Sequence, residues 1–452
     1  MYSKKVFIFT IIITWFLLPI GNAGAEEVTA NPIDSGDTAW MLISAALVLF
    51  MTPGLAFFYG GLVRARNVLN TMMMSLVAMG LIGVTWCLWG YSLAFDVTPG
   101  ASGFGEGLEA FIGGLEWVFL NGVSATEPDP IGYAATIPHQ LFMAYQMMFA
   151  MITPALISGA IVERISFKAY FWFILLWSTF IYSPLAHWVW GKGWIGASGA
   201  LDFAGGDVVH ISSGISAVVA AWMIGPRKSF KEEKLYPPHN VPYVLLGIGM
   251  LWLGWCGFNG GSALASGSLA TVAFVNTTIA SSAGGLTWLI LEWNLRSKPT
   301  AVGIATGFLA GLVGITPAAG FVLPIGAILM GSITAVCCFF AVSLRAKLQF
   351  DDSLDTYPVH GVGGTIGAIF TGFFATKQVN ELGNDGLFFG NPGLVVTQVV
   401  SVIATYIFAA AGTFIILKIL GAFMPLRQDT ERGLDITEHN EEAYGGEYGT
   451  EG

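Results

Sequence analysis

Long apolar segments separated by short polar connections make up most of this chain. After an N-terminal apolar run there are eleven such segments, at 38–60, 68–94, 138–161, 169–190, 206–225, 241–262, 270–293, 300–317, 321–344, 358–375 and 394–424. A helix needs about 20 predominantly apolar residues to cross the hydrocarbon core of a bilayer. The pattern therefore predicts an all-α membrane protein with eleven transmembrane helices.

The N-terminal apolar run differs from the others because it is short and polar residues follow it. Lys4 and Lys5 precede an apolar core at 6–18, and Ala23-Gly24-Ala25 forms a small-residue cleavage site. This order is typical of a secretory signal peptide, and the alternative is a further transmembrane helix. We predict a cleavable signal at residues 1–25 and a mature chain that begins outside the cytoplasm.

Basic residues fall almost entirely on alternate connections. One set of connections, taken with the C-terminal segment, carries fourteen Lys and Arg residues, whereas the other set carries only Lys192 and Lys377. Short cytoplasmic loops are enriched in Lys and Arg, so this asymmetry places the N-terminus outside and the C-terminus inside. The predicted domains after the signal are a membrane domain at 26–425 and a cytoplasmic tail at 426–452.

One short pattern occurs twice. Asp202 is followed eight residues later by His210, and Asp352 is followed by His360 at the same spacing. The first histidine lies in the fifth predicted span and the second in the tenth. Spans one to five and six to ten would have opposite orientations, which is the plan of an inverted repeat. We predict two inverted five-helix repeats plus a C-terminal helix, with the two histidines meeting near the middle of the membrane.

Composition supports the membrane assignment. Hydrophobic residues make up 54% of the chain and charged residues 11%, whereas about 25% of the residues of a typical soluble domain are charged. The 58 glycines would let helix backbones approach closely. The four cysteines lie in apolar stretches without the spacing of a metal or disulfide framework, so we interpret them as buried thiols.

The aspartates and histidines of the repeated pattern carry the candidate chemistry. An aspartate just before a helix can accept hydrogen bonds from backbone N–H groups. Asp202 and Asp352 are therefore predicted helix caps, and attraction of a cation is a second role for Asp202. A single buried histidine is often a packed core residue, but His210 and His360 at matching positions favour a pore-lining pair that could pass a proton. Without carboxylates at the same depth they would make a poor metal site.

Aromatic side chains gather where several spans are expected to end outside. Tyr145 and Phe149 lie one helical turn apart, Phe258 and Ser262 share a helix face, and Trp190 ends the fourth span. Aromatic faces attract small cations, and a serine hydroxyl can accept a hydrogen bond. The alternative interpretation is the belt of Trp and Tyr found at membrane interfaces.

The chain resembles the ammonium transporter (Amt/Mep/Rh) family, on the Amt side. Matching stretches run through nearly all of the mature chain and include FFYGGLVRARNVLN, ERISFKAYF, ALDFAGGDVVHISSGISA, GWCGFNGGSA, DDSLDTYPVHGVGGTIG and ERGLDITEHNEEAY. The resemblance implies a homotrimer with one pore per subunit. It further implies the following sites: ammonium recruitment at Trp190, Tyr145, Phe149 and Ser262 with Asp202 nearby, an aromatic gate at Phe149 and Phe258, and twin pore histidines at His210 and His360. Tyr145 departs from relatives that have Phe at this position.

These features favour an ammonium uptake transporter in an inner or plasma membrane, with a role in nitrogen metabolism. Ammonium would be recruited and deprotonated, and ammonia would cross an apolar pore while the proton follows the twin histidines. A passive ammonia channel, or an ammonium sensor that signals through a cytosolic partner, would share these residues. The family's cytosolic partners are trimeric PII signalling proteins, which bind the inner loops and the tail. We expect no enzyme activity, metal, cofactor or nucleic acid partner.

Overall fold

The computed structural model describes residues 32–97, 107–231 and 237–444. The predicted signal at 1–25 lies outside the described residues. Within the unit that begins at Ile33, the described residues form helices, turns and loops without any strand, and only two isolated β-bridges occur among them. The predicted all-α class is confirmed.

Fifteen α-helices and ten short helical turns follow one another along the described chain. The α-helices are α1 (Ser35–Leu62), α2 (Val68–Thr85), α3 (Tyr91–Phe95), α4 (His139–Ile161), α5 (Phe167–Trp177), α6 (Ser183–Val189), α7 (Trp194–Ala197), α8 (Ser212–Ile224), α9 (Lys228–Lys231), α10 (Val241–Gly260), α11 (Ser268–Arg296), α12 (Ala301–Ile315), α13 (Pro324–Lys347), α14 (Val362–Phe374) and α15 (Gly393–Phe423). The 3-10 and π-helical turns are η1 (Ala65–Asn67), η2 (Trp86–Gly90), η3 (Gly107–Ala110), η4 (Val118–Leu120), η5 (Ser178–Tyr182), η6 (Gly206–Ile211), η7 (Gly261–Ala263), η8 (Tyr357–Gly361), η9 (Leu387–Phe389) and η10 (Asp435–His439).

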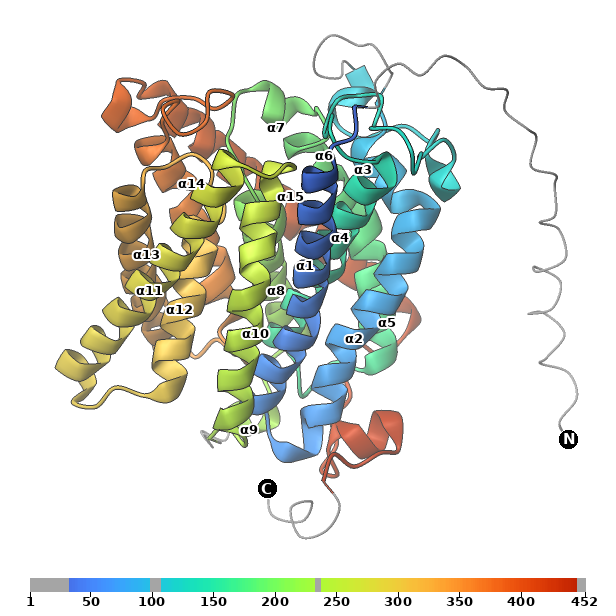
Figure 1. The fold of residues 1–452 in the computed structure, drawn as a ribbon. Helices are drawn as coiled ribbons and strands as arrows, with labels where there is room; N and C mark the ends of the chain where they lie inside the picture. The colour runs from blue at the N-terminus through green and yellow to red at the C-terminus, as the bar shows by residue number, and fades with distance from the viewer. Residues whose placement is uncertain (1–31, 98–106, 232–236, 445–452) are drawn as a thin grey trace, which may run out of the picture. The chain divides into compact units, whose positions relative to one another are not determined.

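Nine helical segments of the described chain are long and apolar enough to cross a membrane (Figure 1). The other two predicted segments form shorter helices, which are α12 with 15 residues and η8 continued by α14. Thr300 caps the start of α12 by accepting a hydrogen bond from the Gly303 N–H, and Pro317 follows its end, so α12 is confined at both ends. The count of eleven membrane spans stays a prediction.

The two halves of the chain meet through helices at matching places. α1 begins the first half and packs along α10, which begins the second. Glycines allow this approach, because a Cβ on Gly54 would lie 2.9 Å from the Met250 Cβ and one on Gly247 would overlap the backbone of Phe58. Likewise, η6 contacts α14 and η8 contacts α8. This reciprocal packing is what the predicted inverted repeat requires.

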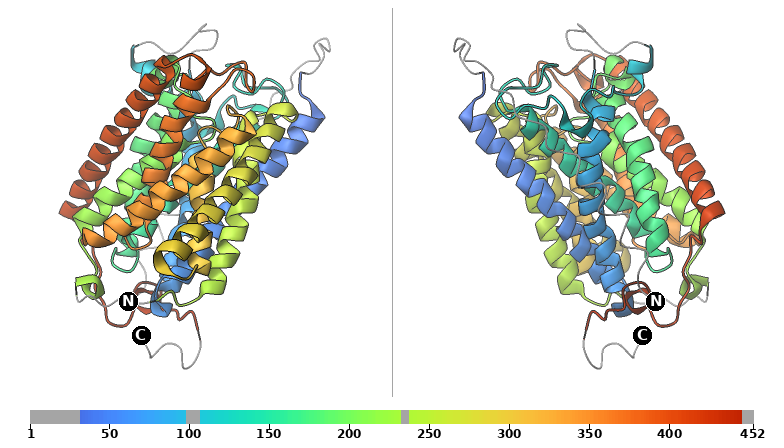
Figure 2. Two further views of the ribbon diagram at one scale, coloured as in Figure 1. Left: turned by 90° about the vertical axis from the view of Figure 1, so that its left-hand side faces the viewer. Right: turned by 90° about the vertical axis from the view of Figure 1, so that its right-hand side faces the viewer.

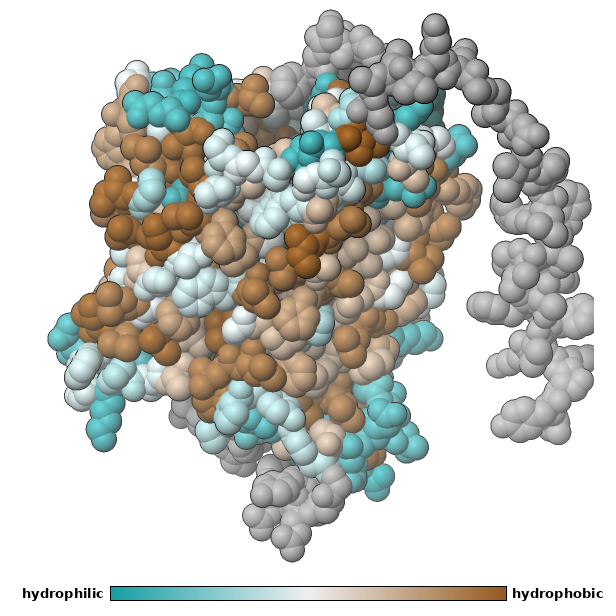
Figure 3. All heavy atoms as spheres, in the orientation of Figure 1, coloured by the Kyte–Doolittle hydropathy of each residue, from teal (hydrophilic) through white to brown (hydrophobic). Residues whose placement is uncertain are grey.

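The helical bundle has polar ends and an apolar waist on the face drawn in Figure 3. Large apolar side chains such as Leu253, Phe274 and Ile290 are exposed, as expected for contact with lipid. We call the end that carries α7 the loop end and the end that carries α9 the tail end (Figure 1). The long helices run between these two ends in both side views of Figure 2.

The last described residues dock onto the tail end rather than leaving it. The Asp435 carboxylate in η10 accepts hydrogen bonds from the backbone N–H groups of Leu69 and Asn70, at 3.1 Å and 2.8 Å. These N–H groups lie in the first turn of α2, which lacks a side-chain cap from its own N-cap residue. Asp435 therefore caps α2 from a segment far away in the sequence. The sequence indicated a tail here but not this docked turn.

Candidate functional site

Five predicted site residues come together at the loop end. α4 supplies Tyr145 and Phe149, α10 supplies Phe258, η7 supplies Ser262, and Trp190 directly follows α6. The Phe149 ring is central, because its centroid lies 5.0 Å from that of Tyr145, 6.0 Å from that of Trp190 and 4.2 Å from that of Phe258. Trp190 and Ser262 are partly exposed, whereas the other three are buried. We call this group the outer cluster.

Two hydroxyl groups lie side by side in the outer cluster. The Tyr145 oxygen is 3.2 Å from the Ser262 Oγ, and each of these oxygens lies 2.8 Å from the carbonyl oxygen of Phe258. A hydroxyl has one proton to donate and two lone pairs that accept. With their protons directed at carbonyls, both oxygens keep lone pairs for a ligand. Aromatic faces beside two hydrogen-bond acceptors suit a small cation that carries N–H groups.

Both histidines of the repeated pattern lie in π-helical turns at the start of helices. His210 belongs to η6, which continues as α8, and His360 belongs to η8, which continues as α14. Such turns are rare and often mark functional sites. Glycines bring the two turns together, because a Cβ on Gly214 would overlap the backbone of Gly361 and one on Gly364 would lie 2.9 Å from the His210 Cβ.

The two imidazole rings face each other through their Nδ1 atoms, which are 3.2 Å apart. In a neutral pair, one Nδ1 must donate and the other accept. The rings are inclined by 25° and are almost fully buried. The Trp255 ring stacks on His210 with centroids 5.4 Å apart, and its indole N–H donates to the Thr316 hydroxyl at 2.9 Å. Trp255 thereby holds one histidine ring in place.

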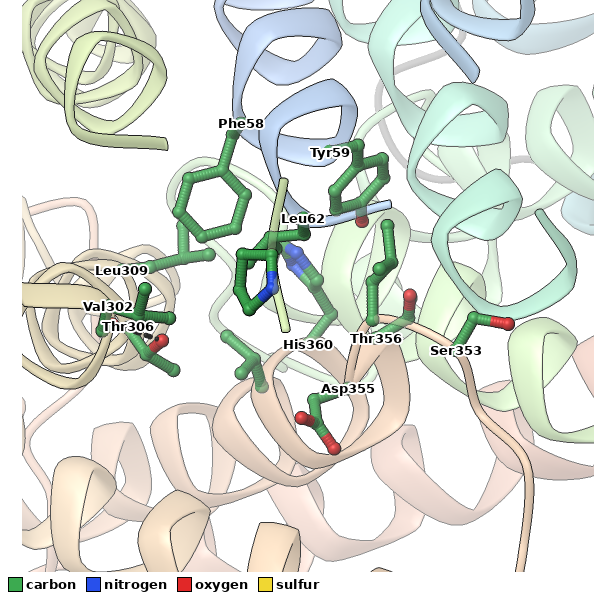
Figure 4. Close-up of a pocket in the computed structure, with 13 residues that line it drawn as sticks. Phe58, Tyr59, Leu62, Val302, Thr306, Leu309, Ser353, Asp355, Thr356 and His360 are labelled. Carbon is green, nitrogen blue, oxygen red and sulfur yellow. Dashed lines mark hydrogen bonds between the residues drawn. The ribbon is translucent and has the colours of Figure 1, made fainter. Parts of the chain in front are cut away.

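Two cavities adjoin the histidine pair. The smaller has a volume of about 10 Å³, has an apolar surface, and is lined by Phe258, Trp255, His210 and His360 among others. That volume is about enough for one water-sized molecule. The larger measures about 260 Å³ and opens among residues at the tail end (Figure 4). His360 and Leu309 line both cavities, and Phe258 of the outer cluster lines the smaller one.

Asp202 and Asp352 lie where their carboxylates meet the backbone of the π-helical turns. Asp202 accepts hydrogen bonds from four successive backbone N–H groups at 2.5–3.3 Å, those of residues 205–208. Asp352 accepts two, from Thr356 at 3.0 Å and Tyr357 at 2.7 Å. Burial raises the pKa of both carboxyls, and these N–H groups oppose the increase. The Trp190 indole N–H also donates to the Asp202 carbonyl at 2.8 Å.

Trp255 and Asp207 are two residues of this region that the sequence reasoning did not identify. Trp255 precedes Phe258 by three residues in GWCGF, so the helical spacing alone could have placed both on one face. Asp207 is buried in η6; the Ser401 hydroxyl donates to one carboxylate oxygen, and the other has no hydrogen-bond partner among the described residues. No group of three or more His, Cys, Asp or Glu in the part of the chain that the structure describes could hold a metal ion.

Comparisons with known proteins agree on one family. The model of the Ammonium Transporter Family matches residues 39–444. An ammonium transporter of Bacillus subtilis (strain 168) is 50% identical over 413 residues, covering 90% of this chain and 98% of that protein. The crystal structure of Saccharomyces cerevisiae Mep2 matches with a TM-score of 0.80 at 36% identity, covering 89% of each chain. A solved sensor Amt protein matches with a TM-score of 0.79 at 28% identity, covering 89% of this chain and 98% of that one.

Proposed function

The chain belongs to the ammonium transporter family, and we propose that it takes up ammonium by binding it at the outer cluster and conducting it as ammonia. In this proposal the loop end faces outward, the tail end faces the cytoplasm, and the proton travels separately along His210 and His360. The observation that carries the proposal is the 3.2 Å contact between the two Nδ1 atoms beside a cavity of about 10 Å³.

Recognition at the outer cluster would depend on hydrogen bonding as well as charge. The rings of Trp190 and Phe149 attract a cation through their faces. Potassium resembles ammonium in charge and size, but it has no proton to donate. The lone pairs of the Tyr145 and Ser262 hydroxyls, 3.2 Å apart, can accept N–H donors from ammonium. The outer cluster therefore favours a cation that donates hydrogen bonds.

Passage beyond Phe258 would require loss of charge. The small cavity is apolar apart from the histidines and holds about one water-sized molecule, so a cation inside it would have almost no hydration. Transfer of an isolated ion from water into an apolar medium costs roughly tens of kcal/mol by ideal Born solvation. Neutral ammonia avoids this cost. The size and polarity of the cavity thus favour ammonia over a whole cation.

The histidine pair can move the released proton. When His210 Nδ1–H donates to His360 Nδ1, the His210 Nε2 holds a free lone pair, and that atom has no partner among the described residues. A proton accepted at this Nε2 drives the shared proton onto His360, whose own Nε2–H then releases its proton into the larger cavity. One proton enters the pair and one leaves it, so ammonium uptake would carry net charge.

Replacing both pore histidines tests the proposal. His210→Leu combined with His360→Leu should keep the fold, because the cavity stays apolar, but it should abolish ammonium-evoked current across liposomes that contain only this protein. The matched control is His239→Leu at the tail end, which should retain the current because His239 lies outside the two cavities. Full ammonium current in the double variant would remove the histidines from the mechanism.

The same recording separates the alternatives. A passive ammonia channel would move ammonia without current in the parent protein. A sensor would show neither current nor ammonium flux in the same liposomes. The likeness to a solved sensor Amt protein supports this candidate. The homotrimer and a PII-type partner at the tail end belong to the proposal as well. Native mass measurement in detergent and binding of a purified PII protein would test them.

A further inference from the structure

His187 occupies an unusual site beside the outer cluster. It lies in α6, three residues before Trp190, and its side chain is fully buried. Its Nδ1 is 3.0 Å from the carbonyl oxygen of Ala94 at the end of α3, and its Nε2 is 2.6 Å from the carbonyl oxygen of Glu109 in η3. Both ring nitrogens therefore face an oxygen that can only accept a hydrogen bond.

A neutral imidazole cannot satisfy both contacts. It carries one N–H and one bare lone pair, so one of the two carbonyl oxygens would face a lone pair at hydrogen-bond distance. The doubly protonated ring donates to both. The 2.6 Å contact with Glu109 is also shorter than an ordinary N–H···O hydrogen bond, and a positive charge on the donor shortens such bonds. Space on this side is tight, because a Cβ on Gly191 would overlap the Ala94 oxygen and lie 2.8 Å from the His187 Nδ1.

The charged groups around His187 are mostly acidic. The carboxyls of Asp96, after α3, and Glu109, in η3, both act on it with a sign that favours the cation. Lys192, in the loop after α6, directs its ammonium group away to the carbonyl of Ile131 at 3.2 Å. Burial is the largest single influence on the ring and opposes a charge, whereas the two carbonyl dipoles and the two carboxyls act in the opposite direction.

We propose that His187 is doubly protonated at neutral pH and acts as a positioning residue for the outer ammonium site. Its two N–H groups join α3 and η3 to α6, the helix that Trp190 directly follows. Trp190 in turn contacts the Phe149 ring and donates to the Asp202 carbonyl. Loss of one proton breaks one of the two contacts and frees the end of α6. The role in ammonium binding rests on the proposed function, whereas the charge state does not.

His139 provides a matched control in the same region. It is equally buried, but its Nε2 lies 2.7 Å from the Tyr91 hydroxyl, which can donate or accept, and its Nδ1 has no hydrogen-bond partner among the described residues. A neutral ring meets those requirements. The structure therefore assigns a charge to one buried histidine of the loop end and none to the other.

Nitrogen NMR of histidine-labelled protein tests the charge state without any transport measurement. At pH 7 one buried imidazole should show two protonated nitrogens, and this signal should disappear in His187→Gln but persist in His139→Gln. If His187→Gln does not fold, the parent spectrum still decides, because a fully buried imidazolium would titrate apart from the half-buried His239 and His439. Absence of any imidazolium at pH 7 would overturn the proposal.

Transport kinetics test the positioning role. The Michaelis constant of the parent for ammonium should rise about tenfold as pH increases through the His187 transition, with the maximal rate unchanged, because one charge-assisted hydrogen bond is lost. His187→Gln should show the raised constant at every pH, and His139→Gln should behave like the parent. A confirmed imidazolium with a pH-independent constant would refute the positioning role. A parent without any ammonium uptake would refute the proposed function and leave the NMR result standing.

Discussion

At the scale of single residues, one phenolic hydroxyl sets the polarity of the outer cluster. The Tyr145 oxygen lies within reach of the Gly257 and Phe258 carbonyls, at 3.0 Å and 2.8 Å, and of the Ser262 Oγ at 3.2 Å. A phenylalanine at this position would leave Ser262 as the one hydroxyl of the five-residue cluster. The aromatic faces would remain, so the change would separate hydrogen bonding from cation attraction.

We expect Tyr145→Phe to raise the Michaelis constant for ammonium about fivefold, because one neutral hydrogen bond contributes about 1 kcal/mol. The maximal rate should change little, since the pore histidines are unaffected. The control is Tyr170→Phe, which removes an equally buried hydroxyl that donates to the Met74 carbonyl at 3.0 Å, away from the cavities. Uptake kinetics in liposomes provide the measurement. Equal constants for the parent and Tyr145→Phe would show that this oxygen does not contact ammonium.

At the scale of elements, the π-helical turns η6 and η8 bring the two histidines of the proposed pore together at the starts of α8 and α14. Each turn contributes one of the two histidines that contact each other. Near the start of each turn, an aspartate accepts hydrogen bonds from backbone N–H groups. Asp202 accepts four such bonds and Asp352 accepts two. The stronger cap therefore belongs to the turn beneath the outer cluster, where Trp190 also contacts the Asp202 backbone.

Substitution of Asp202 should distinguish a cap from a direct cation ligand. Asp202→Asn retains an oxygen acceptor, so folding and part of the transport should survive. Asp202→Ala should lose thermal stability and flux together, with a loss of about 1–2 kcal/mol in the free energy of unfolding. Thermal melting of the purified protein and ammonium flux would be compared, with Asp352→Ala as the matched cap at the tail end. Complete loss of flux in both Asp202 variants with parental melting would indicate direct contact with the cation.

The amino-acid sequence predicts some of the structural elements and not others, for physical reasons. The length of an apolar segment determines a long membrane helix, so the predicted bounds of nine segments lie close to the observed ones. Pro324 at the first position of α13 explains why that helix starts later than the predicted residue 321. The equal spacing of two aspartates and two histidines indicated that the two histidines would meet, as they do. The π-helical turns, the orphan oxygen of Asp207 and the docked η10 depend on contacts between distant segments, and local patterns carry no signal for these.

At the scale of the whole molecule, two buried carboxylates and two half-buried arginines join both halves of the chain at the tail end. Glu163, after α4, contacts Arg64, after α1, at 2.8 Å and Arg227, after α8, at 2.7 Å. Arg227 also contacts Asp351, which lies ahead of η8, at 2.7 Å. Arg427 then ties the docked tail to the same place by donating to the Pro226 carbonyl at 2.9 Å. Helices of both repeats and the tail therefore share one charge network.

The proposed orientation can be tested with two single cysteines. Leu382, in the loop between α14 and α15, is 95% exposed at the loop end, and Leu348, after α13, is 69% exposed at the tail end. Because these positions lie at opposite ends of the bundle, Leu382→Cys should react with an impermeant thiol reagent outside intact cells. Leu348→Cys should react only after the membrane is opened. Reaction of both cysteines from outside would contradict the topology that the basic residues predict.

The charge network should make stability depend on pH in the acid range. Burial alone would raise the pKa of Glu163, but Arg227 and Arg64 outweigh it and hold the pKa at about 2. The unfolded chain has a Glu pKa of about 4.3, so the folded state binds this proton less tightly. The stabilisation is therefore complete above about pH 4.3 and is lost as pH falls towards about 2.

Glu163→Gln should remove this pH dependence and lower the free energy of unfolding at neutral pH by about 3 kcal/mol, because Arg64 and Arg227 lose a buried anionic partner. Glu431→Gln is the control, since Glu431 and its partner Lys228 are both exposed and such pairs contribute little. Thermal melting from pH 7 to about pH 2 would show a steep loss below about pH 4.3 in the parent and control and a flatter profile in Glu163→Gln. Parallel profiles for all three would mean that the acid sensitivity of the protein arises elsewhere, and that the two halves are held together by apolar packing rather than by this network.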